Sequence, residues 1–451
     1  MSSKSHEMDL CSGSLWKKIF VYSVPLMFTN ILQVLFNMSD VAVVGKFAGP
    51  IALGAVGSTS ILVTLFTGIL LGLASGVNAL TALHIGSKDD EGVKRTVHTA
   101  VIICLAGGIL ITVFGILFSH NILALMNTKD ELIDGAVLYL RIYLLGMPAL
   151  GLYNFGNAVL SAAGDTKRPL YYLAFAGVVN VILNLFFVIV CHLGVAGVAL
   201  ASMISQFISA FLILRALLTG KEKYCLHLSE IRFDKRKAVG ILQIGIPSAF
   251  QYSLFAFANL FVQSSVNSFD HVLVEGNSAA ANADPLVYDM MAAFYTACSS
   301  FIAQNFGARK KKRILQTYLI CLFYSFITSL VLGVGIYLAR YPFLYLFTSD
   351  KAVVEAGITR LSIMYSASAF MDASIAASRG LGKTAVPTFV VVMGSCVFRI
   401  IWIYTIFAYF HTIQSLYILY VFSWGITAIA ENIYFFHVYR HTLTGKTESH
   451  L

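Results

Sequence analysis

The chain has 451 residues, of which 58% are hydrophobic and only 12% are charged, with a mean hydropathy of +0.79. Soluble proteins contain about 25% charged residues, so this composition excludes a soluble globular protein and is typical of a polytopic membrane protein. The formal net charge of +9 would suit nucleic-acid binding, but the basic residues lie in short loops between apolar runs, where they indicate membrane topology. We therefore expect the lipid bilayer as a partner and no nucleic acid.

Apolar runs long enough to cross a bilayer, about 20 residues each, recur along the whole chain. The polar residues 1–14 precede the first run without the features of a cleaved signal peptide, and the polar residues 439–451 follow the last run. We expect both segments to be cytoplasmic tails. The sequence predicts an all-α polytopic fold with twelve spans, at residues 15–44, 51–85, 96–118, 132–163, 169–191, 194–218, 240–266, 276–305, 314–339, 354–381, 386–410 and 414–438.

The distribution of Lys and Arg predicts how these spans are oriented. Of the 31 residues of these two types, 24 fall in tails and loops on the side of the N-terminus, and three fall inside spans. The opposite side has only Lys46, Lys129, Arg340 and Lys351. Because positively charged loops stay in the cytoplasm, we expect both termini there, and a bacterial cytoplasmic membrane as the location.

The first span is repeated 222 residues later. This shift pairs Pro25 with Pro247 and Asn37 with Asn259, among eight identities in the 36 positions from Ile19 to Gly54. Six spans per half is an even number, so the halves share one orientation and should be related by a pseudo-two-fold axis along the membrane normal. We expect an N-lobe at 15–218, a cytoplasmic linker at 219–239 and a C-lobe at 240–438.

Asp40 is a carboxylate inside the first span, where an ionisable group is costly and its default interpretation is functional. At a rise of about 1.5 Å per residue, Asn180, Asn184 and Ser202 reach the same outer depth, and the two asparagines share one helix face. We expect these four polar groups to meet and form a site for a coupling ion. Two alternatives stay open: Asp40 could be solvated at the outer mouth, and the asparagines could only join helices.

Several segments resemble the multidrug and toxic compound extrusion (MATE) family. They include VPLMFTNILQVLFNMSDVAVVG, LYNFGNAVLSAAGDTKRPLYYL, GIPSAFQYSLF and AQNFGARKKKR, in the order of the family. The resemblance implies two six-helix lobes that face a central cleft, and drug export driven by proton or sodium entry. It also implies that Asp40, Asn180, Asn184 and Ser202 form the N-lobe cation site. Many members have a second aspartate where Asn184 stands, so we favour proton over sodium coupling.

The repeat carries these four positions onto Val262, Phe398, Trp402 and Tyr420, so the C-lobe counterpart of the ion site is apolar and aromatic. Asp289, Asp372 and Arg399 remain as unexplained charges within spans. They could line the cleft and bind substrate, or pair with each other. The polar candidates for the substrate cleft are Gln33, Asn37, Asn154, Asn157, Gln251, Asn259, Asp289 and Asp372.

These features predict a secondary antiporter, not an enzyme, that exports organic, chiefly cationic and amphipathic compounds in exchange for protons or sodium. We expect it to act as a monomer without a cofactor or a metal site. The alternative is a lipid-linked saccharide flippase of the same broad superfamily. Such a protein needs a cationic cavity for phosphate, whereas the halves of spans 1, 2, 7 and 8 that are expected to face the cleft contain no Lys or Arg.

Overall fold

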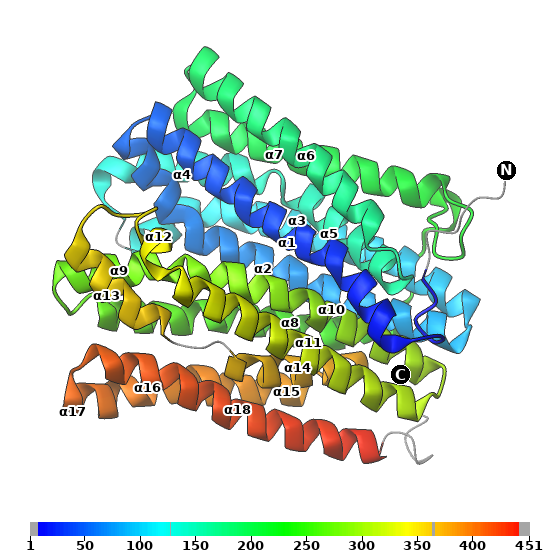
Figure 1. Cartoon of the computed structure of the whole chain (residues 1–451). Helices are drawn as coiled ribbons and strands as arrows, with labels where there is room; N and C mark the ends of the chain where they lie inside the picture. Colours follow the sequence, from blue (N-terminus) through cyan, green and yellow to red (C-terminus); the bar gives the residue numbers. More distant parts are fainter. Residues whose placement is uncertain (1–7, 127, 363–365, 442–451) are drawn as a thin grey trace. The chain divides into compact units, whose positions relative to one another are not determined.

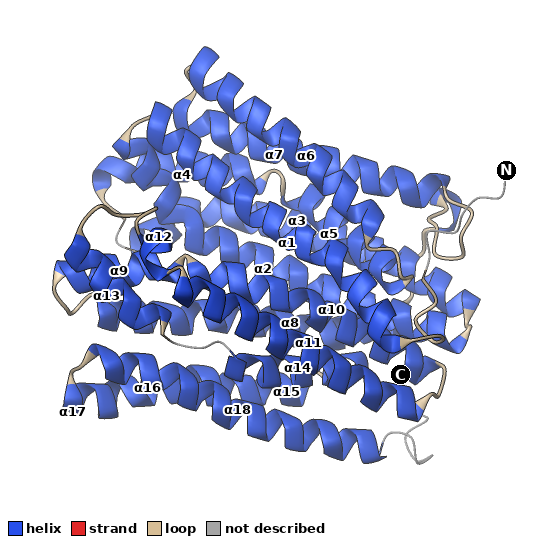
Figure 2. Cartoon of the chain, viewed as in Figure 1, coloured by secondary structure: helices blue, strands red, loops and turns tan. Residues whose placement is uncertain are grey.

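The computed structural model describes residues 8–126, 128–362 and 366–441, and these residues form helices joined by short loops (Figure 1, Figure 2). No strand occurs within these ranges. The all-α class expected from the sequence is therefore confirmed.

The longer helices are α1 (Leu15–Phe47), α2 (Pro50–Ser87), α3 (Asp90–Leu125), α4 (Asp130–Leu144), α5 (Met147–Ala162), α6 (Lys167–Leu185), α7 (Gly194–Thr219), α8 (Lys235–Val266), α9 (His271–Ala281), α10 (Ala283–Gly307), α11 (Lys311–Leu338), α13 (Lys351–Leu361), α14 (Ser366–Gly380) and α18 (Ile413–His441). Short helical segments complete the order: η1 (Phe186–Val190), η2 (Leu228–Glu230), α12 (Arg340–Leu344), α15 (Ala385–Val391), η3 (Val392–Val397), α16 (Phe398–Trp402), η4 (Ile403–Phe407) and α17 (Ala408–Phe410). Of these, η1, η3 and η4 are π-helical and η2 is a 3₁₀ turn.

Among the described residues, ten helical runs are long and apolar enough to cross a membrane, or eleven if the bent pair α4 and α5 is one span. These two helices meet at 45°, where the sequence predicts one continuous span at 132–163. Pro148 lies at the start of α5, and proline is favoured in a first helical turn because it lacks the N–H that would continue a preceding helix. The expected span at 354–381 includes residues 363–365, which lie outside the described residues, so the count of twelve stays a prediction.

The chain divides into two compact units. Within the described residues the first unit comprises 8–9 and 28–249, and the second comprises 10–27 and 250–441. Each division cuts a long helix two residues after a proline: α1 after Pro25 and α8 after Pro247. The predicted lobes assign these helices whole to one half or the other, so the lobe boundaries at 15–218, 219–239 and 240–438 stay a prediction of the repeat.

In the first unit, α5 packs against α2, α3 and α7, and α6 packs against α7. The core of this unit includes Val97, Tyr153 and Ile213, all of them buried. Small residues allow α3 and α5 to approach closely, because a Cβ atom on Gly108 would lie 2.6 Å from the Cα atom of Pro148. Such close backbone contact is typical of helices that associate within a membrane.

In the second unit, α10, α11, α14 and α18 pack together, and α9 packs against α13. The Tyr318 hydroxyl on α11 lies 3.0 Å from the Ser374 hydroxyl on α14 and donates to the Asn432 amide oxygen on α18. Polar side chains that join helices in this way compensate for the missing water in a bilayer.

Matching turns end α5 in the first unit and α14 in the second. Gly164 has φ +88° and Gly382 has φ +74°, a left-handed conformation that glycine adopts without strain. Pro169 and Pro387 follow within the first turn of α6 and α15. The equivalence of the loops AAGDTKRP and GLGKTAVP therefore extends to their backbone geometry.

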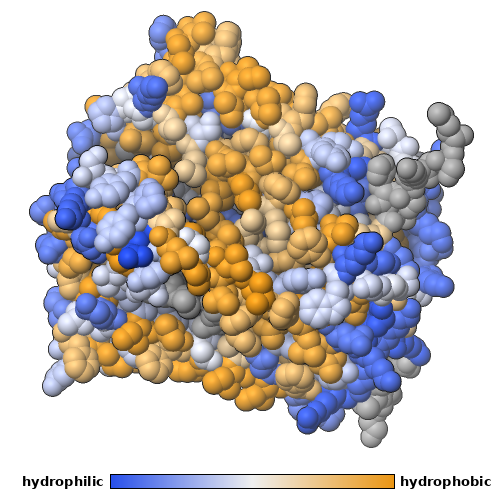
Figure 3. Space-filling model, in the orientation of Figure 1, coloured by the Kyte–Doolittle hydropathy of each residue, from blue (hydrophilic) through white to orange (hydrophobic). Residues whose placement is uncertain are grey.

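On the face shown in Figure 3, the surface along the helices is largely apolar and hydrophilic residues gather near the helix ends. Leu110 and Leu117, for example, are 69% and 66% exposed. Contiguous exposed apolar surface of this kind is rare on soluble proteins. It agrees with the long apolar helices in describing a membrane protein.

Candidate functional site

Four polar side chains from three helices of the first unit form one hydrogen-bonded cluster. α1 provides Asp40, α6 provides Asn180 and Asn184 one turn apart, and α7 provides Ser202. All four are buried, with exposed fractions between 0% and 8%. Because α6 and α7 pack against each other, the asparagine face of α6 and Ser202 are held on a common side.

Both carboxylate oxygens of Asp40 accept hydrogen bonds. The Asn184 amide donates to Oδ1, and the Ser202 hydroxyl donates to Oδ2 over 2.8 Å. The same Asn184 amide lies 3.1 Å from the Asn180 oxygen, and the Asn180 amide donates to Ser202 over 3.4 Å. The structure thus brings together the four residues that the sequence predicts as an ion site.

The carboxylate of Asp40 has neutral hydrogen-bond donors. Among the described residues, no Lys, Arg or His nitrogen forms an ion pair with Asp40. The Asn184 oxygen is buried and has no hydrogen-bond partner within the described part of the chain. A proton on Asp40, or a small cation held by carboxylate, amide and hydroxyl oxygens, would satisfy this arrangement.

Two tyrosines of α4 lie near Asp40, and the sequence did not identify them as part of the site. Tyr139 and Tyr143 interact electrostatically with Asp40, and their rings stack at 5.8 Å. Tyr139 also belongs to an apolar cluster with Val43, Val44 and Val198. A weak signal existed, because the two tyrosines are four residues apart and share a helix face, but tyrosine is too common in this chain for that spacing to stand out.

The counterparts in the second unit form an apolar and aromatic cluster. Val262 and Trp402 are buried there, and Phe398 and Tyr420 pack against the same cluster. The Trp402 indole N–H donates to the Ser415 backbone oxygen over 3.0 Å. None of these side chains is a carboxylate, so the second unit has no acid at the position that matches Asp40.

The predicted cleft residues occupy varied surroundings. Gln33, Asn37 and Asn259 are exposed, Asn157 and Asp289 are half-buried, and Asn154, Gln251 and Asp372 are buried. Each of the last three has one buried polar atom that lacks a hydrogen-bond partner in the described residues. Their assignment to one substrate cleft stays a prediction.

The charges left unexplained by the sequence do not all pair with one another. Arg399 forms no ion pair with Asp289, Asp372 or any other carboxylate of the described residues. It donates instead to the Asn259 amide oxygen over 2.9 Å. The interpretation that Arg399 pairs with one of the two aspartates is therefore wrong, because its hydrogen-bond acceptors are the neutral oxygens of Asn259 and Ser423.

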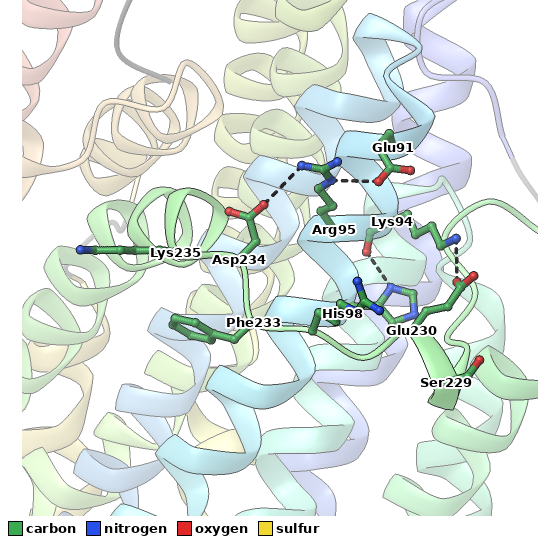
Figure 4. Close-up of a pocket in the computed structure, with 10 residues that line it drawn as sticks. Glu91, Lys94, Arg95, His98, Ser229, Glu230, Phe233, Asp234 and Lys235 are labelled. Atoms are coloured by element: carbon green, nitrogen blue, oxygen red, sulfur yellow. Dashed lines mark hydrogen bonds and ion pairs between the residues drawn. The ribbon is translucent and has the colours of Figure 1, made fainter.

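A separate cavity of about 630 Å³ lies between α3 and the segment that precedes α8, both in the first unit (Figure 4). Arg95 pairs with Glu91 over 2.9 Å and lies 3.8 Å from Asp234, and Lys94 pairs with Glu230 over 2.7 Å. The backbone N–H groups of Lys237 and Arg236 donate hydrogen bonds to the Asp234 carboxylate and lower its pKa. This segment of the expected linker is therefore attached to α3.

The same region holds three ligand-type side chains that the sequence did not reveal as a group. Donor atoms of His98, His227 and Glu230 lie within 4.8 Å of one another. The two ring nitrogens of His98 already have partners: one lies 2.7 Å from the Lys94 backbone oxygen, and the other accepts the His227 backbone N–H over 3.0 Å. Glu230 is paired with Lys94. These contacts fit a structural attachment better than a metal site.

The MatE family model matches residues 25–186 and 247–405, which is one match in each half of the chain. The two matches begin 222 residues apart, which is the shift of the sequence repeat. The chain belongs to the MatE family. Its members are transporters, so this protein is a multi-pass membrane transporter and not an enzyme.

Individual comparisons agree with membership of the MatE family. The chain is 31% identical to the "Probable multidrug resistance protein YpnP" of Bacillus subtilis over 307 residues, which are 68% of each chain. It is 28% identical to the "Probable multidrug resistance protein YoeA" of the same organism, over 83% of each chain. A MOP superfamily transporter from Pyrococcus furiosus has the same fold, with a TM-score of 0.91 at 22% identity over 99% of this chain and 100% of that one.

Proposed function

We propose that this protein is a secondary antiporter that exports amphipathic organic compounds, chiefly cations, in exchange for protons that bind at Asp40. The observation that carries the proposal is the Asp40 carboxylate, which is buried in a span and accepts hydrogen bonds from neutral groups, Asn184 and Ser202. A buried acid without a cationic partner is favoured when it binds a proton or another cation. Exchange of that proton for substrate would couple export to the proton gradient.

The names of the relatives support the substrate class. YpnP and YoeA are both described as probable multidrug resistance proteins. Aromatic side chains, abundant in this chain at 13%, bind organic cations through their ring faces. We propose that the polar cleft candidates and such aromatic residues contact the exported compound.

Sodium is the second candidate for the coupling ion. The amide oxygens of Asn180 and Asn184, the Ser202 hydroxyl and the Asp40 carboxylate are hard oxygen ligands of the kind that alkali and alkaline-earth cations prefer. We favour protons because the cluster contains only one carboxylate, and a second negative charge would strengthen the attraction for a metal cation.

Both termini are proposed to lie in the cytoplasm and the protein to act as a monomer in the bacterial cytoplasmic membrane. The excess of Lys and Arg on the side of the N-terminus supports this orientation. In this orientation, protons from outside the cell would bind to Asp40.

Transport into inverted membrane vesicles tests the function. With an acidic interior, vesicles that contain the protein should accumulate a lipophilic organic cation, and dissipation of the proton gradient should abolish accumulation. A sodium gradient of the same direction should have no effect. Accumulation that needs sodium instead would contradict proton coupling, and selective binding of a lipid pyrophosphate without transport of organic cations would favour a lipid-linked saccharide flippase.

A further inference from the structure

Two buried arginines in the second unit share the aromatic ring of one tyrosine. The guanidinium carbons of Arg360 on α13 and Arg399 on α16 each lie 4.8 Å from the ring centroid of Tyr420 on α18. Arg360 is 5% exposed and Arg399 is 1% exposed. Arginine stacks on aromatic faces, so the ring holds both cations in one place. We call these three residues, together with their hydrogen-bond partners, the arginine cluster.

The charges in this cluster do not cancel. Arg360 pairs with Asp284 over 2.7 Å. The hydrogen-bond partners of Arg399 are neutral: the Asn259 amide oxygen at 2.9 Å and the Ser423 hydroxyl at 3.3 Å. The two guanidinium groups also repel each other electrostatically. Within the described residues the cluster therefore holds two cations and one carboxylate, an excess of one positive charge that a low-dielectric interior disfavours.

The cluster also has open hydrogen-bond donors. The Nε and Nη1 groups of Arg360 are buried and have no acceptor among the residues that the structure describes. Buried donors are nearly always hydrogen-bonded in folded proteins, so we expect these two groups to bind an acceptor. An anion would satisfy the donors and the surplus charge together.

The sequence repeat relates this cluster to the ion site of the first half. Tyr420 stands at the position that matches Ser202, and Val262 stands at the position that matches Asp40. Within the described residues neither Asp40 in the first half nor Arg399 in the second half forms an ion pair. At these matching positions the first half therefore has an acid, whereas the second half has a tyrosine ring that contacts two arginines.

We propose that Arg360, Arg399 and Tyr420 bind the anionic group, a carboxylate or a phosphate, of an amphipathic compound that the transporter exports. The planar fork of arginine matches both groups and forms strong charge-assisted hydrogen bonds with them. Tyr417 and Phe255, which lie 5.5 Å from Arg360 and 5.8 Å from Arg399, add aromatic surface for an adjoining ring. The choice of an exported compound as ligand rests on the proposed transport function.

A matched pair of dyes tests the site by binding alone. A diaminoxanthene dye with a free benzoate and the same dye as its methyl ester differ in one negative charge. In nanodiscs of phosphatidylcholine that contain the full chain, fluorescence anisotropy should show the acid bound about tenfold more tightly than the ester. Equal binding of the two dyes, or failure of the acid to bind, would overturn the proposal.

Variants of Arg399 test whether the arginines cause the preference for the acid dye over its ester. Arg399→Gln should weaken binding of the acid about tenfold and leave binding of the ester within about twofold, whereas Arg399→Lys should keep part of the preference. Lys351→Gln, which removes an exposed positive charge from the start of α13, is the matched control and should change neither. A similar loss for both dyes in Arg399→Gln would overturn the assignment, and a thermal melt of each variant checks that it is folded.

Lipid phosphate offers the same chemistry as an exported anion. Repeating the titration in phosphatidylglycerol nanodiscs separates the two sources. An unchanged preference supports an exported compound, and a preference lost only in the anionic lipid keeps the anion site but assigns it to a lipid headgroup, against the proposed ligand. Because the dyes are tested for binding and not for transport, a failure of the antiport function would leave these results unaffected.

Discussion

The carboxylate of Asp40 accepts hydrogen bonds at both oxygens, and each donor is neutral. The sequence predicts this group of residues because asparagines four apart share a helix face and the rise per residue fixes their depth. The position of the α4 tyrosines near Asp40 could not be predicted in this way, because it depends on how α4 packs against the other helices. Their spacing carries no information about that placement.

A second carboxylate in this site should change its ion preference. Asn184→Asp places another negative charge beside Asp40, which increases the Coulomb attraction for a cation. We expect sodium to raise the melting temperature of this variant in nanodiscs, with an affinity for sodium about tenfold higher than that of the wild type.

The neutral variant Asn184→Gln is the control for this change, because it keeps an amide and adds no charge. Its melting temperature should not depend on sodium. An equal response of the two variants to sodium would contradict the electrostatic explanation.

At the scale of elements, the attachment of the linker to α3 shows what local sequence cannot predict. Residues 219–239 are polar and indicate a loop, and nothing in their sequence identifies α3 as the partner of Glu230 and Asp234. In the structure Asp234 also caps α8, because its side chain accepts the backbone N–H of Arg236 over 2.9 Å and that of Lys237 over 3.2 Å.

Removal of this cap should destabilise the protein. We expect Asp234→Ala to lower the free energy of unfolding by about 1 kcal/mol and the melting temperature in detergent by about 1–2 °C. The folded-state pKa of Asp234 is lowered, chiefly by the Lys237 N–H. Its stabilising effect is therefore present above the unfolded-state pKa and is lost as the pH falls through the folded-state pKa.

Melting curves at neutral and acidic pH measure this effect. The difference between wild type and Asp234→Ala should shrink in acid. Asp234→Asn retains a capping oxygen and should fall between the two at neutral pH. A difference that does not vary with pH would show that the charge of Asp234 has no role.

Other elements differ from the sequence prediction for identifiable reasons. The sequence at 132–163 is apolar throughout, so hydropathy alone does not predict the break between α4 and α5, although Pro148 lies just after this break. The π-helical segments η1, η3 and η4 lie within expected spans, and hydrophobic length does not distinguish them from α-helix. The span expected at 276–305 is divided between α9 and α10, and α3 extends beyond both ends of the span expected at 96–118.

At the scale of the whole molecule, the repeat explains why one family model matches the chain twice. Its two copies differ at the predicted ion site, where one copy has Asp40 and the other has Val262 at the matching position. The prolines of α1 and α8 lie at matching positions, and the compact units divide just after each of them. Repetition therefore made the architecture predictable, whereas the unit boundaries required the three-dimensional structure.

The orientation in the membrane can be tested with a native cysteine. Cys191 is exposed at the end of η1, and the other six cysteines are buried or half-buried. The positive-inside rule places this end of the span outside the cell. A membrane-impermeant maleimide should therefore label intact cells that express the wild type, and Cys191→Ser should remove the label. Labelling of Cys191 only after the cells are permeabilised would reverse the proposed orientation.

Proteoliposomes with an internal pH dye measure proton exchange at Asp40. When an organic cation is added to wild-type proteoliposomes that hold a proton gradient, the gradient should collapse in proportion to the substrate moved. Asp40→Asn should bind the substrate and leave the gradient intact, while Asp130→Asn, a change at an exposed acid at the start of α4, should behave as the wild type. Collapse of the gradient by Asp40→Asn at the wild-type rate would contradict proton coupling through Asp40.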